Sequence, residues 1–123
     1  MIEPGQIVLF RFPYTNLQEG KMRPALIVAK IPGRFDDWLT CAISTQLRQQ
    51  IPNFDETIKE RDEDYASSGL KSESLIRVCR LGVLEGTVFE GAIGKITPER
   101  LHRIKSRLSK SQSYCSPTWT TAA

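Results

Sequence analysis

The sequence contains one histidine and three cysteines, at positions 41, 79 and 115, and no two of the cysteines form a Cys-x-x-Cys pair. Zinc sites and disulfide frameworks need clustered or regularly spaced Cys and His residues, so this composition argues against both. Because His102 is the lone histidine, a Cys–His catalytic centre is also disfavoured. We therefore expect a protein that uses no metal and no other cofactor.

Long apolar runs are also missing, since no segment approaches the roughly 18 apolar residues of a membrane-spanning helix. The N-terminus lacks the pattern of a signal peptide. We expect no membrane partner and a cytoplasmic location. The chain has no glycine-rich phosphate loop, carboxylate dyad or nucleophile elbow. Its candidate chemistry is therefore limited to arginines and hydroxyl groups near strand ends.

The charge is unevenly distributed along the 123 residues. Residues 53–64 hold six acidic and two basic residues, a local net charge of −4, which leaves +7 for the rest of a chain whose total is +3. Such a surplus suits a polyanionic partner, although simple solubility explains it equally well. The length predicts one small domain with a modest core.

Short β-branched and aromatic segments between proline, glycine and aspartate clusters predict strands. We expect them at 6–12, 25–30, 39–45, 74–81 and 87–96, with a further short strand at about 56–58. Gly91 and Gly94 in the last segment favour a bulge or a close backbone contact. Thr97 as N-cap and Pro98 as first helical residue predict one helix at the end of the domain.

This helix has an apolar stripe at spacings of three and four, formed by Leu101, Ile104 and Leu108. Its other face is basic, and we expect that face to be solvated, with nucleic-acid contact as the alternative; it is formed by Arg100, Arg103, Lys105, Arg107 and Lys110. Short strands with one terminal helix predict a mainly β fold, a small and strongly curved antiparallel barrel or half-barrel. We expect residues 1–110 to form this domain and the Ser/Thr-rich residues 111–123 to form a tail.

Arg23 precedes Pro24 at the start of the second predicted strand. Pro24 fixes its own φ and favours an extended conformation for Arg23, which would hold the guanidinium at the start of the strand. A planar guanidinium pairs with two phosphate oxygens at once. The alternative is an arginine that braces a loop carboxylate such as Glu19.

Several short motifs follow one another along about residues 3 to 110: Gly5-Gln6-Ile7-Val8 with Phe12-Pro13, Arg23-Pro24-Ala25-Leu26-Ile27-Val28, Ile43-Ser44-Thr45-Gln46, Gly69-Leu70 with Ser74-Leu75-Ile76-Arg77, and Ile93-Gly94-Lys95-Ile96. This ordered set resembles the MazF/PemK-type toxins of toxin–antitoxin pairs, which are sequence-selective endoribonucleases. The resemblance implies an SH3-like curled sheet with a C-terminal helix. It also implies a homodimer that binds an acidic antitoxin, and operator DNA only through that antitoxin.

The resemblance further implies metal-independent cleavage of single-stranded messenger RNA by its own 2′-hydroxyl, with Arg23 and Ser44 as the catalytic residues. The residues expected to bind RNA are Thr45, Gln46, Arg77, Lys21 and Tyr14. Where some family members carry an acid, this chain has Cys79, for which we expect a core-packed thiol. Phe35 and Trp38, in predicted loops, would either stack on bases or anchor those loops.

Two rival functions remain open on the sequence alone. One is a non-catalytic SH3-like module that binds RNA or an antitoxin. The other is a co-repressor that binds DNA with its antitoxin.

Overall fold

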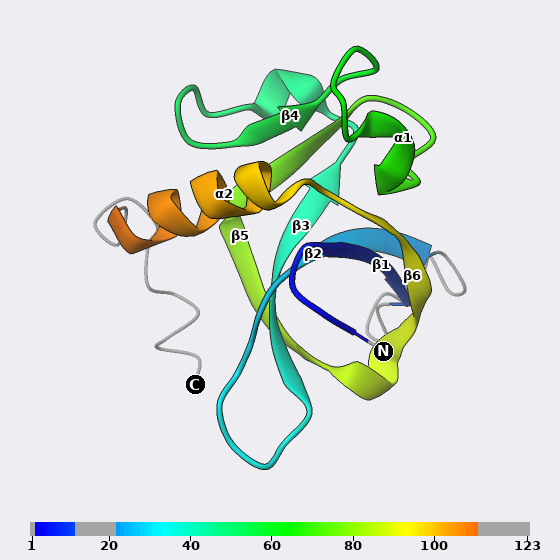
Figure 1. Ribbon diagram of the computed structural model, residues 1–123, viewed down its shortest axis with the longest axis vertical. Coiled ribbons are helices and arrows are strands. Elements are labelled where there is room, and N and C mark those ends of the chain that lie inside the picture. Colours follow the sequence, from blue (N-terminus) through cyan, green and yellow to red (C-terminus); the bar gives the residue numbers. More distant parts are fainter. Residues whose placement is uncertain (1, 12–21, 111–123) are drawn as a thin grey trace.

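Six strands form a single antiparallel sheet in the order β4-β5-β3-β2-β1-β6. The computed structural model describes residues 2–11 and 22–110. The sheet is strongly curved and α2 lies across it (Figure 1), so the expected mainly β fold with a terminal helix is confirmed. The strands are β1 (Gln6–Arg11), β2 (Met22–Lys30), β3 (Asp37–Ser44), β4 (Glu56–Ile58), β5 (Ser74–Glu85) and β6 (Phe89–Lys95).

The terminal helix α2 (Pro98–Lys110) begins where the sequence predicts. The Thr97 Oγ1 atom accepts a hydrogen bond from the backbone N–H of Arg100 at 3.2 Å, which is the expected N-cap contact. The sequence did not predict the one-turn helix α1 (Tyr65–Ser68) or the 3-10 turns at Leu47–Gln49 and Gly86–Val88. The predicted tail, 111–123, lies outside the described residues.

The sheet departs from regular pairing in three strands, namely β6, β5 and β2, where Val28 is left out of the ladder with β3. The β1–β6 register shifts twice and leaves Glu90 and Ile93 as extra residues on β6, which confirms the predicted bulge. A Cβ atom on Gly94 would lie only 2.1 Å from the Ser67 carbonyl oxygen, so α1 packs directly on this backbone. The neighbouring β3 residues Cys41 and Ala42 pair with Leu81 and Arg77 of β5. The three β5 residues between these partners, Val78–Arg80, therefore form a further bulge.

Hydrophobic side chains pack on both faces of the sheet, because successive strand residues point to opposite faces. Leu26 belongs to the larger cluster, which also contains Ile104 of α2. Ile27 belongs to a smaller cluster on the opposite face. Trp38 is buried in that smaller cluster as a residue of β3. Its prediction as a loop residue was therefore wrong, because β3 begins earlier than its apolar run suggests.

Candidate functional site

A groove of about 680 Å³ opens beside the smaller cluster, on the sheet face opposite α2. Its walls come from β1, β2, β3, β5 and the turn that follows β3. Three arginines line it, Arg23, Arg77 and Arg80. No Asp or Glu is among the described residues that line it. The groove is therefore a positively charged surface with an apolar floor.

Arg23 is the second residue of β2 and lies opposite Phe10 of β1. Its side chain is exposed, and no hydrogen bond or ion pair joins it to any residue that the structure describes. β2 begins before Pro24 rather than at Ala25. At Pro24 the strand pairs with β1 only, so its missing N–H disturbs no ladder with β3. Glu19, the alternative partner for Arg23, lies outside the described residues.

Ser44 ends β3 and lines the groove on the same face as Arg23. The β2–β3 ladder ends at the pair Ala25–Ala42, and continuing that register by two residues sets Arg23 opposite Ser44. The Ser44 Oγ atom accepts the N–H of Gln46 at 3.0 Å. This turn fixes the side chain while its hydroxyl hydrogen stays available to a ligand. The structure thus brings the two predicted catalytic residues to one end of the groove.

Thr45 and Gln46 are exposed at the groove edge, as their predicted role requires. Arg77 lies opposite Ala42 of β3, with its side chain 16% exposed. The Arg77 Nη1 atom donates to Gln49 Oε1 at 2.8 Å, and its Nε lies 3.8 Å from Asp55 Oδ2. The remaining predicted RNA-binding residues, Lys21 and Tyr14, lie outside the described residues.

Sequence reasoning missed three residues of this site, namely Arg80, Gln49 and Asp55. Strict alternation along β5 puts Arg80 and Arg77 on opposite faces, but the bulge brings both to the groove. Asp55 was counted only as part of an acidic segment. Its burial next to a basic strand could not be read from the charge of that segment.

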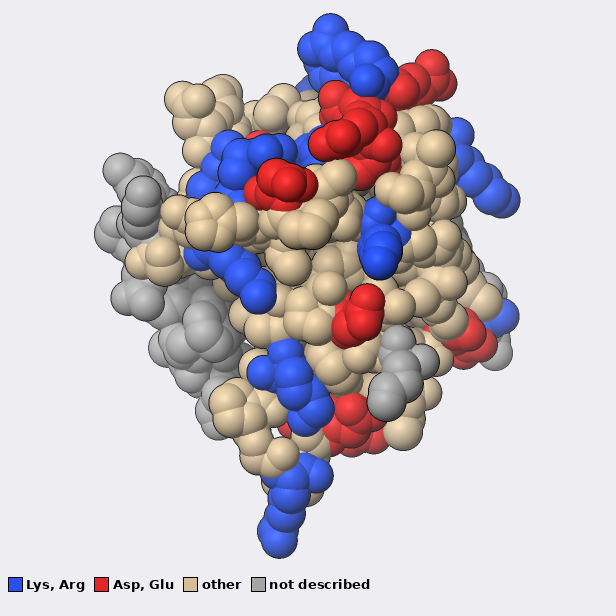
Figure 2. Space-filling view, in the orientation of Figure 1, with Lys and Arg blue, Asp and Glu red and all other residues tan. Residues whose placement is uncertain are grey.

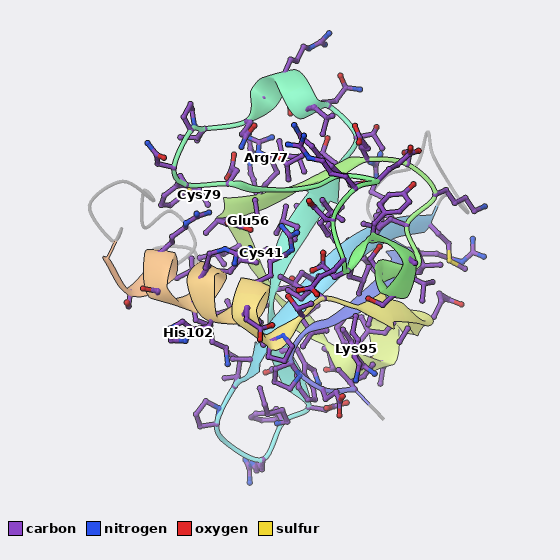
Figure 3. All side chains as sticks on the ribbon, turned by 45° about the horizontal axis from the view of Figure 1, so that its top comes forward. Cys41, Glu56, Arg77, Cys79, Lys95 and His102 are labelled. Carbon is purple, nitrogen blue, oxygen red and sulfur yellow. The ribbon has the colours of Figure 1, made fainter. Side chains whose placement is uncertain are left out.

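The cysteines offer no nucleophile in the described part of the chain. Burial, with a smaller contribution from the charge of Asp55, raises the pKa of the Cys41 thiol to about 12. Cys79 is half-buried and disulfide-bonded, so the expectation of a core-packed thiol is wrong. Cys79 belongs to the β5 bulge, which takes it out of the ladder with β3. His102 is exposed on α2 (Figure 3).

Phe35 is 64% exposed near the turn between β2 and β3, outside the groove lining. Trp38 is held by a hydrogen bond from its Nε1 to Asp36 Oδ1 at 2.8 Å and packs in the smaller cluster. Neither aromatic residue therefore lines the groove, and Trp38 is an anchor.

The three arginines on the basic face of α2 pair with carboxylates of the protein itself. Arg100 is 8% exposed and donates to Asp64 at 2.7 Å, to Glu56 at 2.9 Å and to Asp62 at 3.1 Å. Arg103 and Arg107 also pair with Glu56. Basic and acidic side chains consequently lie side by side near α2 and β4 (Figure 2). The expectation of a solvated basic face was wrong for Arg100, because the acidic segment folds back on the helix.

The pKa shifts follow from this pairing. Burial alone raises the pKa of Asp64, but the hydrogen bonds from Arg100 and Thr97 and the Arg100 charge outweigh it, and the pKa of Asp64 falls below its ordinary value. Burial lowers the pKa of Arg100, and its carboxylate partners more than restore it.

Among residues 2–11 and 22–110, no group of three or more His, Cys, Asp and Glu side chains is arranged to hold a metal ion. No helix in the described part of the chain is long and apolar enough to cross a membrane.

Comparison with known proteins gives a family and a fold. A family model described as PemK-like, MazF-like toxin of type II toxin–antitoxin system matches residues 3–111. No curated protein sequence matches the chain.

The solved structures that are similar in fold include the following two. An endoribonuclease in complex with its cognate antitoxin from a mycobacterial species has a TM-score of 0.62 and 16% identity, covering 93% of this chain and 97% of that one. The Mycobacterium tuberculosis toxin MazF-mt6 has a TM-score of 0.64 and 14% identity, covering 88% of this chain and 96% of that one. At such identities, the similarity establishes the fold alone.

Proposed function

Because the chain belongs to the PemK-like, MazF-like toxins of type II toxin–antitoxin systems, we propose that it is an endoribonuclease that cleaves single-stranded messenger RNA in the arginine-lined groove. The observation that carries this proposal is a groove that Ser44 and the exposed Arg23 both line and whose described lining holds no carboxylate. Such a surface attracts a polyanion, and Arg23 has no described acid to neutralise it.

A single strand is the suitable substrate, because base edges can be read directly only when the bases are unpaired. Arg77 and Arg80 bind phosphates on either side of the scissile one. Thr45 and Gln46 carry hydroxyl and amide groups at the groove edge, where they contact base edges and give the cleavage its sequence preference.

The reaction uses the substrate's own 2′-hydroxyl as nucleophile. Its oxygen bonds to the adjacent phosphorus and the P–O5′ bond breaks, which gives a 2′,3′-cyclic phosphate and a 5′-hydroxyl. Arg23 stabilises the charge that gathers on the phosphorane oxygens by bidentate contact, and the Ser44 hydroxyl donates to a non-bridging oxygen.

One proton leaves the 2′-hydroxyl and one joins the departing 5′ oxygen. Arg23 does not accept the first, since an arginine pKa lies above about 12. The acceptor is then a phosphate oxygen, a water molecule or a group from a second subunit.

Cleavage of single-stranded RNA in the presence of EDTA tests the proposal. We expect cyclic-phosphate products without added metal, and no cleavage of the same oligonucleotide made entirely of 2′-deoxy nucleotides. The Arg23→Ala variant, purified identically, controls for contaminating nuclease. Activity that EDTA abolishes and magnesium or manganese restores would refute the metal-independent mechanism, whereas RNA binding without cleavage would favour a non-catalytic binding module.

The proposal includes a cytoplasmic homodimer whose groove is closed, in the inhibited state, by an acidic antitoxin segment. An acidic peptide and RNA would compete for the same three arginines. Sedimentation at tens of micromolar tests the dimer, and a pure monomer would contradict it. Operator DNA is expected to bind only through the antitoxin.

A further inference from the structure

The β5 bulge has a buried carboxylate at its base. Between the pairs Ala42–Arg77 and Cys41–Leu81 the bulge takes Val78 out of the ladder with β3. The Val78 N–H donates instead to Asp55 Oδ1 at 3.0 Å. The Asp55 side chain is 1% exposed. A buried N–H without a partner would be costly, so this carboxylate stabilises the bulge in its bent form.

The second oxygen of the same carboxylate lies beside the groove arginine. Asp55 Oδ2 accepts the Ile51 N–H at 2.9 Å and lies 3.8 Å from Arg77 Nε. On the other side of the guanidinium, Gln49 Oε1 accepts from Arg77 Nη1 at 2.8 Å. These two partners restrain the Nε and Nη1 atoms. Nη2 has no hydrogen-bond partner among the described residues, which leaves it available to a ligand in the groove.

Asp55 and its neighbour Glu56 serve different sides of the structure. Both are buried, yet Asp55 contacts β5 and Arg77 whereas Glu56 contacts the arginines of α2. Asp55 lies in the bend before β4, whereas Glu56 is the first residue of β4. In Figure 3, Glu56 lies nearer to α2 than Arg77 does.

We propose that Asp55 is a positioning residue: its buried carboxylate pins the β5 bulge and holds Arg77 in the orientation that binds an RNA phosphate. The proposal deepens the RNA-cleaving function and rests on it, since Arg77 must contact the substrate. Because Arg23 and Ser44, rather than Arg77, are proposed to stabilise the transition state, loss of the Arg77 orientation weakens substrate binding more than the chemical step.

The test compares Asp55→Asn with wild-type protein on a single-stranded RNA oligonucleotide. Asparagine keeps the shape but loses the charge and one acceptor oxygen. We expect KM to rise on the order of 10- to 100-fold, with the single-turnover rate at saturation changed by about threefold or less. The Kd for the uncleavable 2′-deoxy oligonucleotide should rise in parallel. In an Arg77→Ala background, Asp55→Asn should add nothing to the loss of affinity.

Glu56→Gln is the matched control, because Glu56 adjoins Asp55 and is similarly buried. It should lower the melting temperature and leave KM within about twofold of wild type at temperatures well below melting. If Asp55→Asn does not fold, Gln49→Ala removes only the exposed restraint on Arg77 and should still raise KM measurably. Equal effects of Asp55→Asn and Glu56→Gln on KM, or additive effects with Arg77→Ala, would overturn the proposal.

The Arg77 Nε–H signal in a ¹H–¹⁵N spectrum supplies a test that needs no RNA. Its chemical shift should be the same in wild type and in Glu56→Gln, and should move in Asp55→Asn, because the carboxylate charge 3.8 Å from Nε is lost, or, if that variant does not fold, in Gln49→Ala. An unchanged signal would overturn the positioning role whatever the substrate is. If the signal changes as expected but wild-type protein neither binds nor cleaves RNA, the RNA-cleaving function fails while the restraint on Arg77 is confirmed.

Discussion

Arginines gather on both faces of the sheet, and the two groups differ in what surrounds them. In the groove, Arg23 contacts no described acid. On the opposite face, Arg100 is enclosed by three carboxylates, and Glu56 alone pairs with three arginines of α2. The comparison shows that net charge does not locate a binding surface. The acidic segment pairs with three arginines of the helix and, through Asp55, with Arg77, which leaves Arg23 and Arg80 in the groove without a described acidic partner.

The same residue type therefore has opposite consequences in the two places. A buried, fully paired arginine contributes to stability mainly because removing it leaves its partner carboxylates buried and unpaired, at a cost of about 3–5 kcal/mol. An exposed arginine such as Arg23 contributes little to stability and keeps its hydrogen-bonding capacity for a ligand. Exchanging single residues in each group tests this contrast.

The largest effect is expected in the groove. Arg23→Ala should lower single-turnover cleavage by at least about 1000-fold, because it removes charge stabilisation made mainly in the transition state, and RNA affinity should fall far less. Arg23→Lys should restore little activity, since an ammonium group lacks the planar geometry with which a guanidinium contacts two phosphate oxygens. The melting temperature should stay close to that of wild type. Near-wild-type cleavage by the folded Ala variant would remove Arg23 from the active site.

The opposite pattern is expected on the α2 face. Arg100→Met should destabilise the protein by about 3–5 kcal/mol, since it leaves Asp64 buried without its arginine partner. Denaturant unfolding measures the loss. Cleavage at a temperature where the variant is folded should remain near that of wild type. A large loss of cleavage in the folded variant would show that the two groups of arginines are coupled.

A smaller effect is expected at the strand end opposite Arg23. Ser44→Ala should lower single-turnover cleavage by about 100-fold, because one preorganised donor to the phosphorane is lost. Ser44→Thr keeps the hydroxyl and should preserve most of the activity. The assignment would be wrong if both variants, with unchanged melting temperatures, cleaved RNA at equal rates.

The smallest effect concerns the pH dependence of the buried ion pairs. The pKa of Asp64 is lower in the folded protein than its ordinary value of about 3.9, which approximates the unfolded chain. Its contribution to stability is therefore complete above about pH 4 and is lost as the pH falls through the lowered folded pKa. Stability below pH 4 should fall less steeply in Asp64→Asn than in Glu63→Gln, a change at an exposed neighbour. Identical slopes would contradict this role.

Much of the fold and part of the site follow from local patterns in the sequence. Short β-branched and aromatic segments between turn residues predict the strands, and Thr97 with Pro98 predicts the start of α2, because strand propensity and helix capping depend on near neighbours. Arg23 was recognised from its neighbour Pro24 and from the ordered family motifs. Ser44 was recognised only from those motifs. The predicted catalytic roles of both remain predictions, as does the tail at 111–123.

The rest depended on contacts between segments far apart in the chain. The bulge that brings Arg80 beside Arg77 arises where β5 pairs with β3, and Asp55 stabilises it from 23 residues away. The ion pair between Arg100 and Asp64 joins positions 36 residues apart. A sequence pattern records the spacing and charge of these residues but not which of them share a buried, low-dielectric site. Only the tertiary structure decides which arginines are neutralised and which remain free to bind.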